Sequence, residues 1–94
     1  MFFVYMVRCA DGTLYTGYAR NVESRMKAHN AGRGAKYTAP RLPVSLVYWE
    51  PCETRGSALK REFEVKQLRR SEKEKLADSA GETLKLPVME HQIK

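Results

Sequence analysis

The sequence of 94 residues lacks most of the features that would place it in a specialised class of protein. No apolar run approaches the ~20 residues that a membrane-spanning helix needs. The 2 cysteines and 2 histidines do not stand at zinc-binding spacings. The first residues, MFFVYMVRC, lack the basic leader and the small-residue cleavage site of a signal peptide. We therefore expect a cytoplasmic protein with no membrane contacts, in which Cys9 and Cys52 are reduced thiols.

Acidic residues are in deficit, because 11 Asp and Glu face 17 Lys and Arg and leave a net charge of +6. A small basic domain suits polyanions, since Lys and Arg displace counterions from phosphates. Basic charge alone is weak evidence, because many basic proteins bind nucleic acid without specificity. The length allows one small domain and not two, and we expect a monomer or weak dimer.

Runs of aromatic and β-branched residues over 2–9 and 13–18 predict two strands, which an Asp-Gly turn joins. Asn21 is a suitable N-cap for a helix that stops near residue 30. Glycines, prolines and basic residues over 31–43 predict an ordered loop, which leads to a third strand over 44–50. Thr54 is a suitable N-cap for a helix of about residues 55–69.

A last helix is expected to start at the capping box of Ser71 and Glu74 and to end at Gly81. The order β-β-α-β-α-α predicts an α+β domain, a small three-stranded antiparallel sheet flanked by helices. We assign residues 1–80 to this single domain. Residues 81–94 have no clear period, so we expect a frayed or loosely docked C-terminal tail.

The turn between the first two strands decides how their tyrosines are placed, because side chains alternate between the faces of a sheet. A two-residue loop, Asp11-Gly12, would set Tyr5 opposite Tyr18. A three-residue loop that starts at Ala10, with Gly12 left-handed, would make Tyr5 and Tyr15 diagonal neighbours on one face. Both turns are compatible with the sequence. The Asp-Gly pair by itself favours the first, whereas a shared site for two phenols needs the second.

Arg25 and His29 stand four residues apart and so share one face of the first helix, beside Val22 and Met26. Two interpretations of Arg25 are equally good: its aliphatic stem covers the margin of the core, or its guanidinium has a functional role. For His29, a satisfied or solvated histidine is the more frequent case without further support.

A carboxylate falls on the apolar side of the helix over 55–69. Glu62 lies between Ala58 and Leu59 on the helical wheel, whereas Glu64 faces away. A buried carboxylate costs free energy unless it is paired. An ion pair with Lys66 or Arg25 and a role as metal ligand or general base are equally good explanations. The residues that we expect to span the apolar side are Ala58, Leu59, Phe63, Val65 and Leu68.

The middle loop combines basic side chains with an aromatic one, Arg33, Lys36, Tyr37 and Arg41. This composition suits a nucleic-acid backbone and an unstacked base, although a solvated loop explains each residue singly almost as well. Lys66, one turn after Glu62, adds to this basic set.

Five short motifs in this order resemble the GIY-YIG nuclease domain, in particular its small stand-alone URI branch. They are FVY at Phe3–Tyr5, YTG at Tyr15–Gly17, RMKAHN from Arg25, GRGAKYT at Gly32–Thr38 and REFEVK at Arg61–Lys66. The resemblance covers roughly residues 2 to 76. The leading glycine and isoleucine of the first signature are replaced here, which leaves its tyrosine in place.

The resemblance implies a metal-dependent endonuclease that acts on DNA, with single-stranded or branched DNA as possible substrates. It assigns the signature tyrosines to Tyr5 and Tyr15, the catalytic arginine to Arg25 and the metal-binding glutamate to Glu62. His29 matches a histidine of many members and is expected to relay protons or hold the phosphate, and Gly17 is the structural glycine of the second signature. One Mg²⁺ or Mn²⁺ ion is implied on Glu62, which waters can complete.

A tyrosine would orient or deprotonate the attacking water, and the sequence does not decide between Tyr5 and Tyr15. A non-catalytic nucleic-acid-binding module that keeps the fold is the main rival interpretation. A protein-interaction domain with a basic face is a third. The endonuclease is favoured because a pure binder needs no inward carboxylate such as Glu62.

Overall fold

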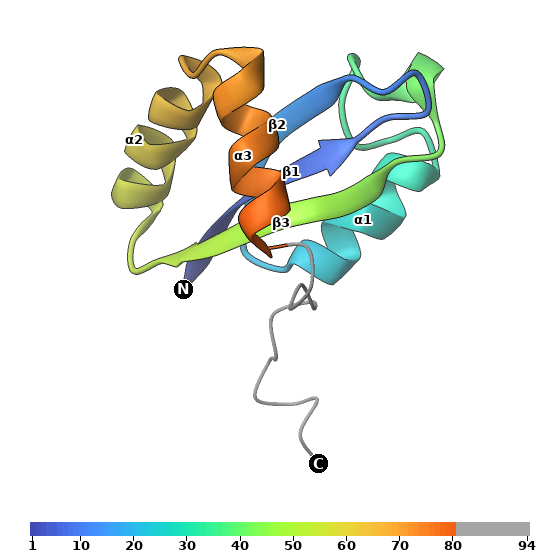
Figure 1. The fold of residues 1–94 in the computed structure, drawn as a ribbon. Coiled ribbons are helices and arrows are strands. Elements are labelled where there is room, and N and C mark those ends of the chain that lie inside the picture. Colours follow the sequence, from blue (N-terminus) through green and yellow to red (C-terminus); the bar gives the residue numbers. More distant parts are fainter. Residues whose placement is uncertain (81–94) are drawn as a thin grey trace.

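The structure is a computed structural model that describes residues 1–80, so the expectations for the tail 81–94 and for a helix end at Gly81 lie outside the described residues. The chain forms an α+β domain with the predicted order β-β-α-β-α-α (Figure 1). Its elements are β1 (Phe2–Arg8), β2 (Leu14–Ala19), α1 (Val22–Asn30), the 3-10 helix η1 (Ala39–Arg41), β3 (Ser45–Cys52), α2 (Arg55–Lys66) and α3 (Arg70–Ala80). Over residues 1–80 no helix has the length and apolar character to cross a membrane.

The three strands form one antiparallel sheet in the order β2-β1-β3. The central strand β1 is the most apolar segment, and five consecutive residues of it are buried on both faces. Its pairing with β3 shifts register between Met6 and Val7, which bends β3 at that point. The edge strand β2 is the one that bears Tyr15 and Gly17.

The hairpin between β1 and β2 uses the three-residue loop. The Cys9 amide donates to the Thr13 carbonyl at 2.8 Å, and the Gly12 amide donates to the Cys9 carbonyl at 2.9 Å. Gly12 has φ +88°, the left-handed conformation that glycine adopts without strain. As a result Val7 pairs with Tyr15, and the two-residue turn that the Asp-Gly pair favours is not used.

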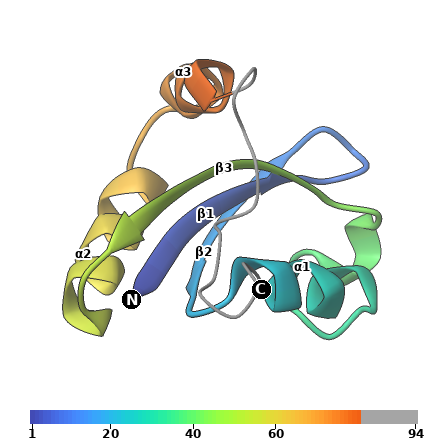
Figure 2. The ribbon, with the colours of Figure 1, turned by 90° about the horizontal axis from the view of Figure 1, so that it is seen from below.

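The sheet separates two cores of different character (Figure 2). On one side, which we call the α1 face, Tyr5, Val7, Cys9 and Val44 are buried, and α1 with the loop 31–43 covers them. On the other side, the α2–α3 face, the buried residues are Val4, Met6, Ala58, Val65 and Ala77. Tyr18 packs against this second core, which confirms that it points away from Tyr5.

The N-caps of α1 and α2 are those that the sequence predicts. The Asn21 side-chain oxygen accepts from the Ser24 amide at 2.9 Å. Thr54 forms a reciprocal capping box with Ser57. α2 ends at Lys66, three residues before the predicted end, because the Leu68 amide turns back to the Val65 carbonyl at 3.1 Å and tightens the last turn.

The predicted capping box at the start of α3 is wrong. The Glu72 carboxylate caps the helix by accepting from the Arg69 amide at 2.8 Å, so α3 begins at Arg70. Glu74 instead accepts from Arg8 at 2.6 Å and from Arg70 at 3.2 Å. The long-range pair with Arg8 ties α3 to the central strand.

The predicted apolar side of α2 is also partly wrong. Leu59 and Phe63 are 39 % and 64 % exposed, whereas Ala58 and Val65 are buried. The reason is geometric, because residues seven apart lie almost in line along a helix and α2 meets the sheet along only this narrow stripe. Leu59 and Phe63 lie too far around the helix to reach it.

Candidate active site

A chain of buried hydrogen bonds runs from β1 to the middle loop across the α1 face. The Tyr5 hydroxyl lies 2.8 Å from His29 Nε2, and His29 Nδ1 lies 2.9 Å from the Thr38 hydroxyl. Tyr5, His29 and Thr38 are all at most 1 % exposed. The helix α1 delivers His29 because Asn21 fixes its first turn two turns earlier. His29 is therefore a satisfied histidine whose partners include a candidate catalytic phenol.

The two signature tyrosines both contact this histidine. The ring centroids of Tyr5 and Tyr15 lie 5.8 Å and 5.5 Å from that of His29, each at an interplanar angle of 70°. Gly17 makes this arrangement possible, since a Cβ at that position would lie 2.6 Å from the Tyr5 oxygen. Tyr5 is buried, whereas Tyr15 is only partly buried and nearer the surface.

Burial and charge keep both partners of the central hydrogen bond neutral. Burial raises the pKa of the Tyr5 phenol well above its ordinary value, and the positive charge of Arg25 opposes this. Burial and the Arg25 charge both lower the pKa of His29. At neutral pH the site thus holds a protonated phenol beside an uncharged imidazole.

The charges of Arg25 and Glu62 act on the same phenol from different elements. Arg25 comes from α1 and Glu62 from α2, and the charges of both act on the Tyr5 hydroxyl. The Arg25 Nε atom is buried and has no hydrogen-bond partner within residues 1–80. A buried donor without an acceptor is costly, so this atom is suited to an oxygen that a ligand brings.

Glu62 is the more buried of the two neighbouring carboxylates, as the sequence predicts, with a side chain 16 % exposed against 49 % for Glu64. It pairs with Lys66 at 3.3 Å, one of the two explanations that the sequence left open. No group of three or more His, Cys, Asp or Glu side chains that could hold a metal ion occurs within the described part of the chain. A single carboxylate fits a Mg²⁺ or Mn²⁺ ion that keeps most of its waters and gains further oxygens from a substrate phosphate.

Two hollows lie along the edge strand on either side of Gly17. The first, of about 510 Å³, takes its β2 side from Tyr18 and Ala19 and is lined by Arg20, Arg25 and Arg55. The second, of about 310 Å³, contains Leu14 and Thr16 and is lined by Tyr15, Tyr37, Lys66 and Lys73. Basic side chains therefore line both hollows along β2.

Aromatic rings form a stack at the second hollow. Tyr37 stacks on Tyr15 with ring centroids 6.0 Å apart and an interplanar angle of 17°. The Arg41 guanidinium lies 4.0 Å above the Tyr37 ring centroid. Tyr37 remains 40 % exposed, so one side of this stack is accessible to a flat ligand such as a base.

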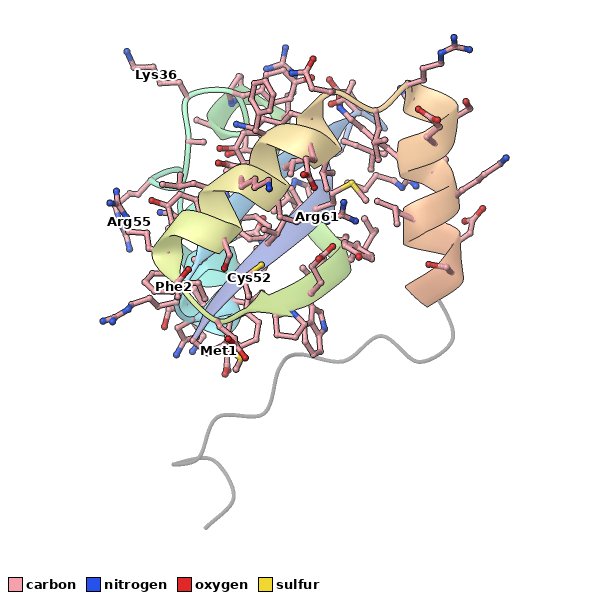
Figure 3. The ribbon with its side chains drawn as sticks, turned by 90° about the vertical axis from the view of Figure 1, so that its left-hand side faces the viewer. Met1, Phe2, Lys36, Cys52, Arg55 and Arg61 are labelled. Atoms are coloured by element: carbon pink, nitrogen blue, oxygen red, sulfur yellow. The ribbon has the colours of Figure 1, made fainter. Side chains whose placement is uncertain are left out.

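The other predicted nucleic-acid contacts are distributed unevenly. Arg41 holds the Asp11 carboxylate at 3.1 Å and the Tyr37 carbonyl at 2.7 Å, so it orders the loop. Arg33 and Lys36 are exposed and line neither hollow. Lys36 and Arg55 point outward on the same side of the molecule, whereas Arg61 points from α2 toward β3, where it binds Glu50 at 2.9 Å (Figure 3).

Sequence reasoning missed several residues of the site. Thr38 stands at the end of the motif GRGAKYT but is given no role by it, although its hydroxyl contacts His29. Arg20, Arg55 and Lys73 lie in three separate elements or their flanks. Their gathering along β2 follows from the packing of the helices, which no local pattern indicates.

Comparisons with known proteins identify a family and several relatives of this chain. The family model described as the GIY-YIG catalytic domain matches residues 1–75. A UPF0213 protein of Staphylococcus aureus is 57 % identical over 74 residues, which cover 79 % of this chain and 90 % of that protein. The solution NMR structure of a UPF0213 protein from Bacillus halodurans has 42 % identity and a TM-score of 0.56, and it covers 88 % of this chain and 89 % of its own.

A second solution NMR structure, of a protein from E. faecalis, has 39 % identity and a TM-score of 0.55 and covers 82 % of each chain. The family match spans both signature tyrosines and the helix that carries Glu62. The chain therefore belongs to the GIY-YIG family of nuclease-type catalytic domains.

Proposed function

We propose that this protein is an endonuclease that hydrolyses phosphodiester bonds in DNA with the help of one divalent metal ion. The observation that carries the proposal is the buried hydrogen bond between Tyr5 and His29, beside the Nε donor of Arg25, which has no partner within the described residues 1–80. A pure binding surface has no use for a phenol that is coupled to an imidazole below the surface. Family membership supports the same reaction class.

The water that attacks phosphorus gives its proton to the Tyr5 oxygen, and Tyr5 passes its own proton to His29 Nε2. This relay removes the difficulty that a phenol with a raised pKa is seldom ionised, because no free phenolate forms. The new oxygen–phosphorus bond forms as the bond to the leaving oxygen breaks. The leaving oxygen takes a proton from solvent water, and His29 returns its extra proton to solvent. In this relay Tyr5, and not Tyr15, is the group that activates water.

Arg25 supplies the positive charge that phosphoryl transfer requires. Its buried Nε atom has no acceptor within residues 1–80, and a phosphate oxygen would complete it. Such charge-assisted bonds are strong in a site that excludes water. Arg25 thus has two effects, since it neutralises the substrate and keeps His29 uncharged until the relay operates.

Glu62 would hold the metal ion, with waters and a phosphate oxygen as the remaining ligands. The ion, when bound, supplies Lewis-acid stabilisation of the charge that develops on the phosphate and the leaving oxygen. Lys66 competes for the Glu62 carboxylate in the absence of substrate. We expect the ion to be held weakly until DNA is present.

The DNA strand would follow the edge strand β2, with phosphates at the arginine-lined hollow and a base against Tyr37. The basic side chains on both sides of Gly17 support this path. An unpaired base stacks on an exposed ring more readily than a paired one, which favours single-stranded or branched DNA.

A matched pair of glutamates on α2 tests the proposal. Glu62→Gln should abolish metal-dependent cleavage of single- and double-stranded DNA in Mg²⁺ or Mn²⁺, whereas Glu64→Gln, two residues on and exposed, should leave it unchanged. EDTA should stop the wild-type reaction. Equal cleavage by both variants, or no cleavage by the wild type, would contradict the endonuclease proposal. DNA binding without cleavage would favour the non-catalytic binding module.

A further inference from the structure

We propose that Thr38 is a positioning residue, which fixes His29 in the tautomer with a proton on Nδ1 and so directs the Tyr5 proton to Nε2. The effect of Thr38 on catalysis rests on the proposed endonuclease mechanism, whereas the tautomer of His29 does not. The proposal concerns a residue that does not touch the substrate and acts only through His29. Three buried groups, the Tyr5 and Thr38 hydroxyls and the His29 imidazole, share a fixed number of protons.

The Thr38 hydroxyl has two neighbours and only one proton. Its oxygen lies 3.2 Å from the Ala35 carbonyl oxygen and 2.9 Å from His29 Nδ1. A carbonyl oxygen accepts hydrogen bonds and never donates, so the contact with Ala35 is a hydrogen bond only when the hydroxyl proton points to Ala35. Both contacts of Thr38 are hydrogen bonds at once only when its oxygen accepts from His29, and this arrangement places a proton on Nδ1. Thr38 is fully buried, so solvent does not offer the hydroxyl another acceptor.

The protonation of Nδ1 determines whether Nε2 carries a proton or a free lone pair. The imidazole is uncharged, because burial and Arg25 lower its pKa, so a proton on Nδ1 leaves a lone pair on Nε2. The Tyr5 hydroxyl, 2.8 Å away, donates to this lone pair. In the other tautomer Nε2 would donate to the phenol oxygen, and His29 could not take the Tyr5 proton. The tautomer therefore sets the direction of the relay.

The loop around Thr38 is built to hold this geometry. The Ala39 amide donates to the Ala35 carbonyl at 3.1 Å, which fixes the acceptor of the Thr38 hydroxyl. Asn30 closes the loop by accepting from the Val44 amide at 2.8 Å. Gly34 packs directly on the histidine, since a Cβ there would lie 2.7 Å from His29 Cα. A glycine at position 34 is thus required for the loop to approach His29 closely.

Two substitutions separate the hydroxyl from the volume of the side chain. Thr38→Val keeps the shape and removes the hydroxyl, whereas Thr38→Ser keeps the hydroxyl. Imidazole ¹⁵N chemical shifts report the tautomer directly, and a His91→Gln variant assigns the His29 signals. We expect the Nδ1-protonated tautomer in the wild type and in Thr38→Ser. Thr38→Val should populate the Nε2-protonated form.

The kinetic result should follow the spectroscopic one. Thr38→Val should lower kcat on the order of 100-fold, because general acid–base transfer loses its acceptor, while KM stays close to the wild-type value. Thr38→Ser should recover most of kcat. A wild-type protein with the proton on Nε2, or a Thr38→Val variant that keeps the proton on Nδ1, would overturn the proposal. If the wild type fails to cleave DNA, the endonuclease proposal falls, but the ¹⁵N shifts still decide the role of Thr38.

Discussion

The two faces of the sheet use the same strands for different purposes. On the α2–α3 face the side chains of β1 meet an apolar core, and the charged groups there are paired, Arg8 with Glu74 and Arg61 with Glu50. On the α1 face the neighbouring residues bury Tyr5 and His29 in a hydrogen-bonded chain, beside an Arg25 Nε donor that has no partner within residues 1–80. The α2–α3 face thus combines an apolar core with paired charges, whereas the α1 face buries a chain of polar side chains beside a cation.

Tyr15 and Tyr18 are close in sequence but belong to different faces of the sheet. They stand three residues apart on β2, yet Tyr15 stacks on Tyr37 at the site and Tyr18 packs on the opposite core. A single residue of turn length decides this, because a change of register by one moves every side chain to the other face. Stability and activity should therefore respond to different substitutions.

The largest effect should come from the core of the α2–α3 face. Met6 is fully buried there, so Met6→Ala should lower the free energy of unfolding by about 2–5 kcal/mol. Urea denaturation measures this change. Leu59→Ala, at a side chain 39 % exposed, is the control and should cost much less. Cleavage per folded molecule should be the same in both variants. A lower cleavage rate in Met6→Ala alone would show that the α2–α3 face also contributes to activity.

Gly17→Ala should have the next largest effect, and this effect should be on the rate of DNA cleavage. The new Cβ would lie 2.6 Å from the Tyr5 oxygen, so Tyr5 has to leave its place beside His29. We expect cleavage to fall on the order of 100-fold, with a loss of about 1–3 kcal/mol in stability from overpacking. Gly56→Ala, whose Cβ would meet nothing closer than 3.9 Å, should keep full activity and stability. Equal behaviour of the two variants would count against the site.

A smaller effect is expected for the exposed ring at the second hollow. Tyr37→Ala should weaken binding of a fluorescently labelled single-stranded oligonucleotide by about 1–3 kcal/mol, because one base loses its stacking partner. Tyr37→Phe should bind like the wild type. Phe63→Ala removes an aromatic ring that is 64 % exposed on α2 and lines neither hollow. Fluorescence anisotropy should show no change for it, and a comparable loss would refute the assignment.

The smallest effect concerns pH and the docking of α3. Hydrogen bonds from Arg8 lower the pKa of Glu74 from its ordinary value of 4.5 to about 2. A folded-state pKa below the unfolded value stabilises the protein above pH 4.5, and this contribution disappears as the pH falls toward 2. Unfolding in urea should therefore depend less on pH across this window in Glu74→Gln than in the wild type. An identical dependence would show that the ion pair does not stabilise the fold.

Most of the fold could be predicted from the sequence because the signals are local. Asn21 and Thr54 cap helices where side-chain chemistry requires it, and β-branched and aromatic runs form the strands. The start of α3 was missed because Glu72 and Glu74 both lie in its first turns, and only the position of Arg8 in space decides which one caps. Leu59 and Phe63 were misplaced because helical spacing does not reveal how wide the buried stripe is.

The candidate site was predictable to the extent that residues matched short motifs. Tyr5, Tyr15 and His29 do meet, and the charges of Arg25 and Glu62 reach the same phenol. The hydrogen bond of Thr38 was not predictable, since it depends on how the loop folds back over α1. The choice between the two hairpin turns also needed the structure, because the Asp-Gly pair favours the turn that is not used.

The proposed mechanism requires that Tyr5, and not Tyr18 of the opposite face, takes part in the chemistry. Cleavage rates of Tyr5→Phe and Tyr18→Phe, measured beside the wild type in Mg²⁺ with thermal melts to confirm folding, test it most directly. We predict that Tyr5→Phe lowers kcat on the order of 10²- to 10⁴-fold. Tyr18→Phe should keep the wild-type kcat and change only KM, because the Tyr18 hydroxyl accepts from Arg55 at the first hollow and does not act on the attacking water. A folded Tyr5→Phe variant that cleaves as fast as the wild type would contradict it.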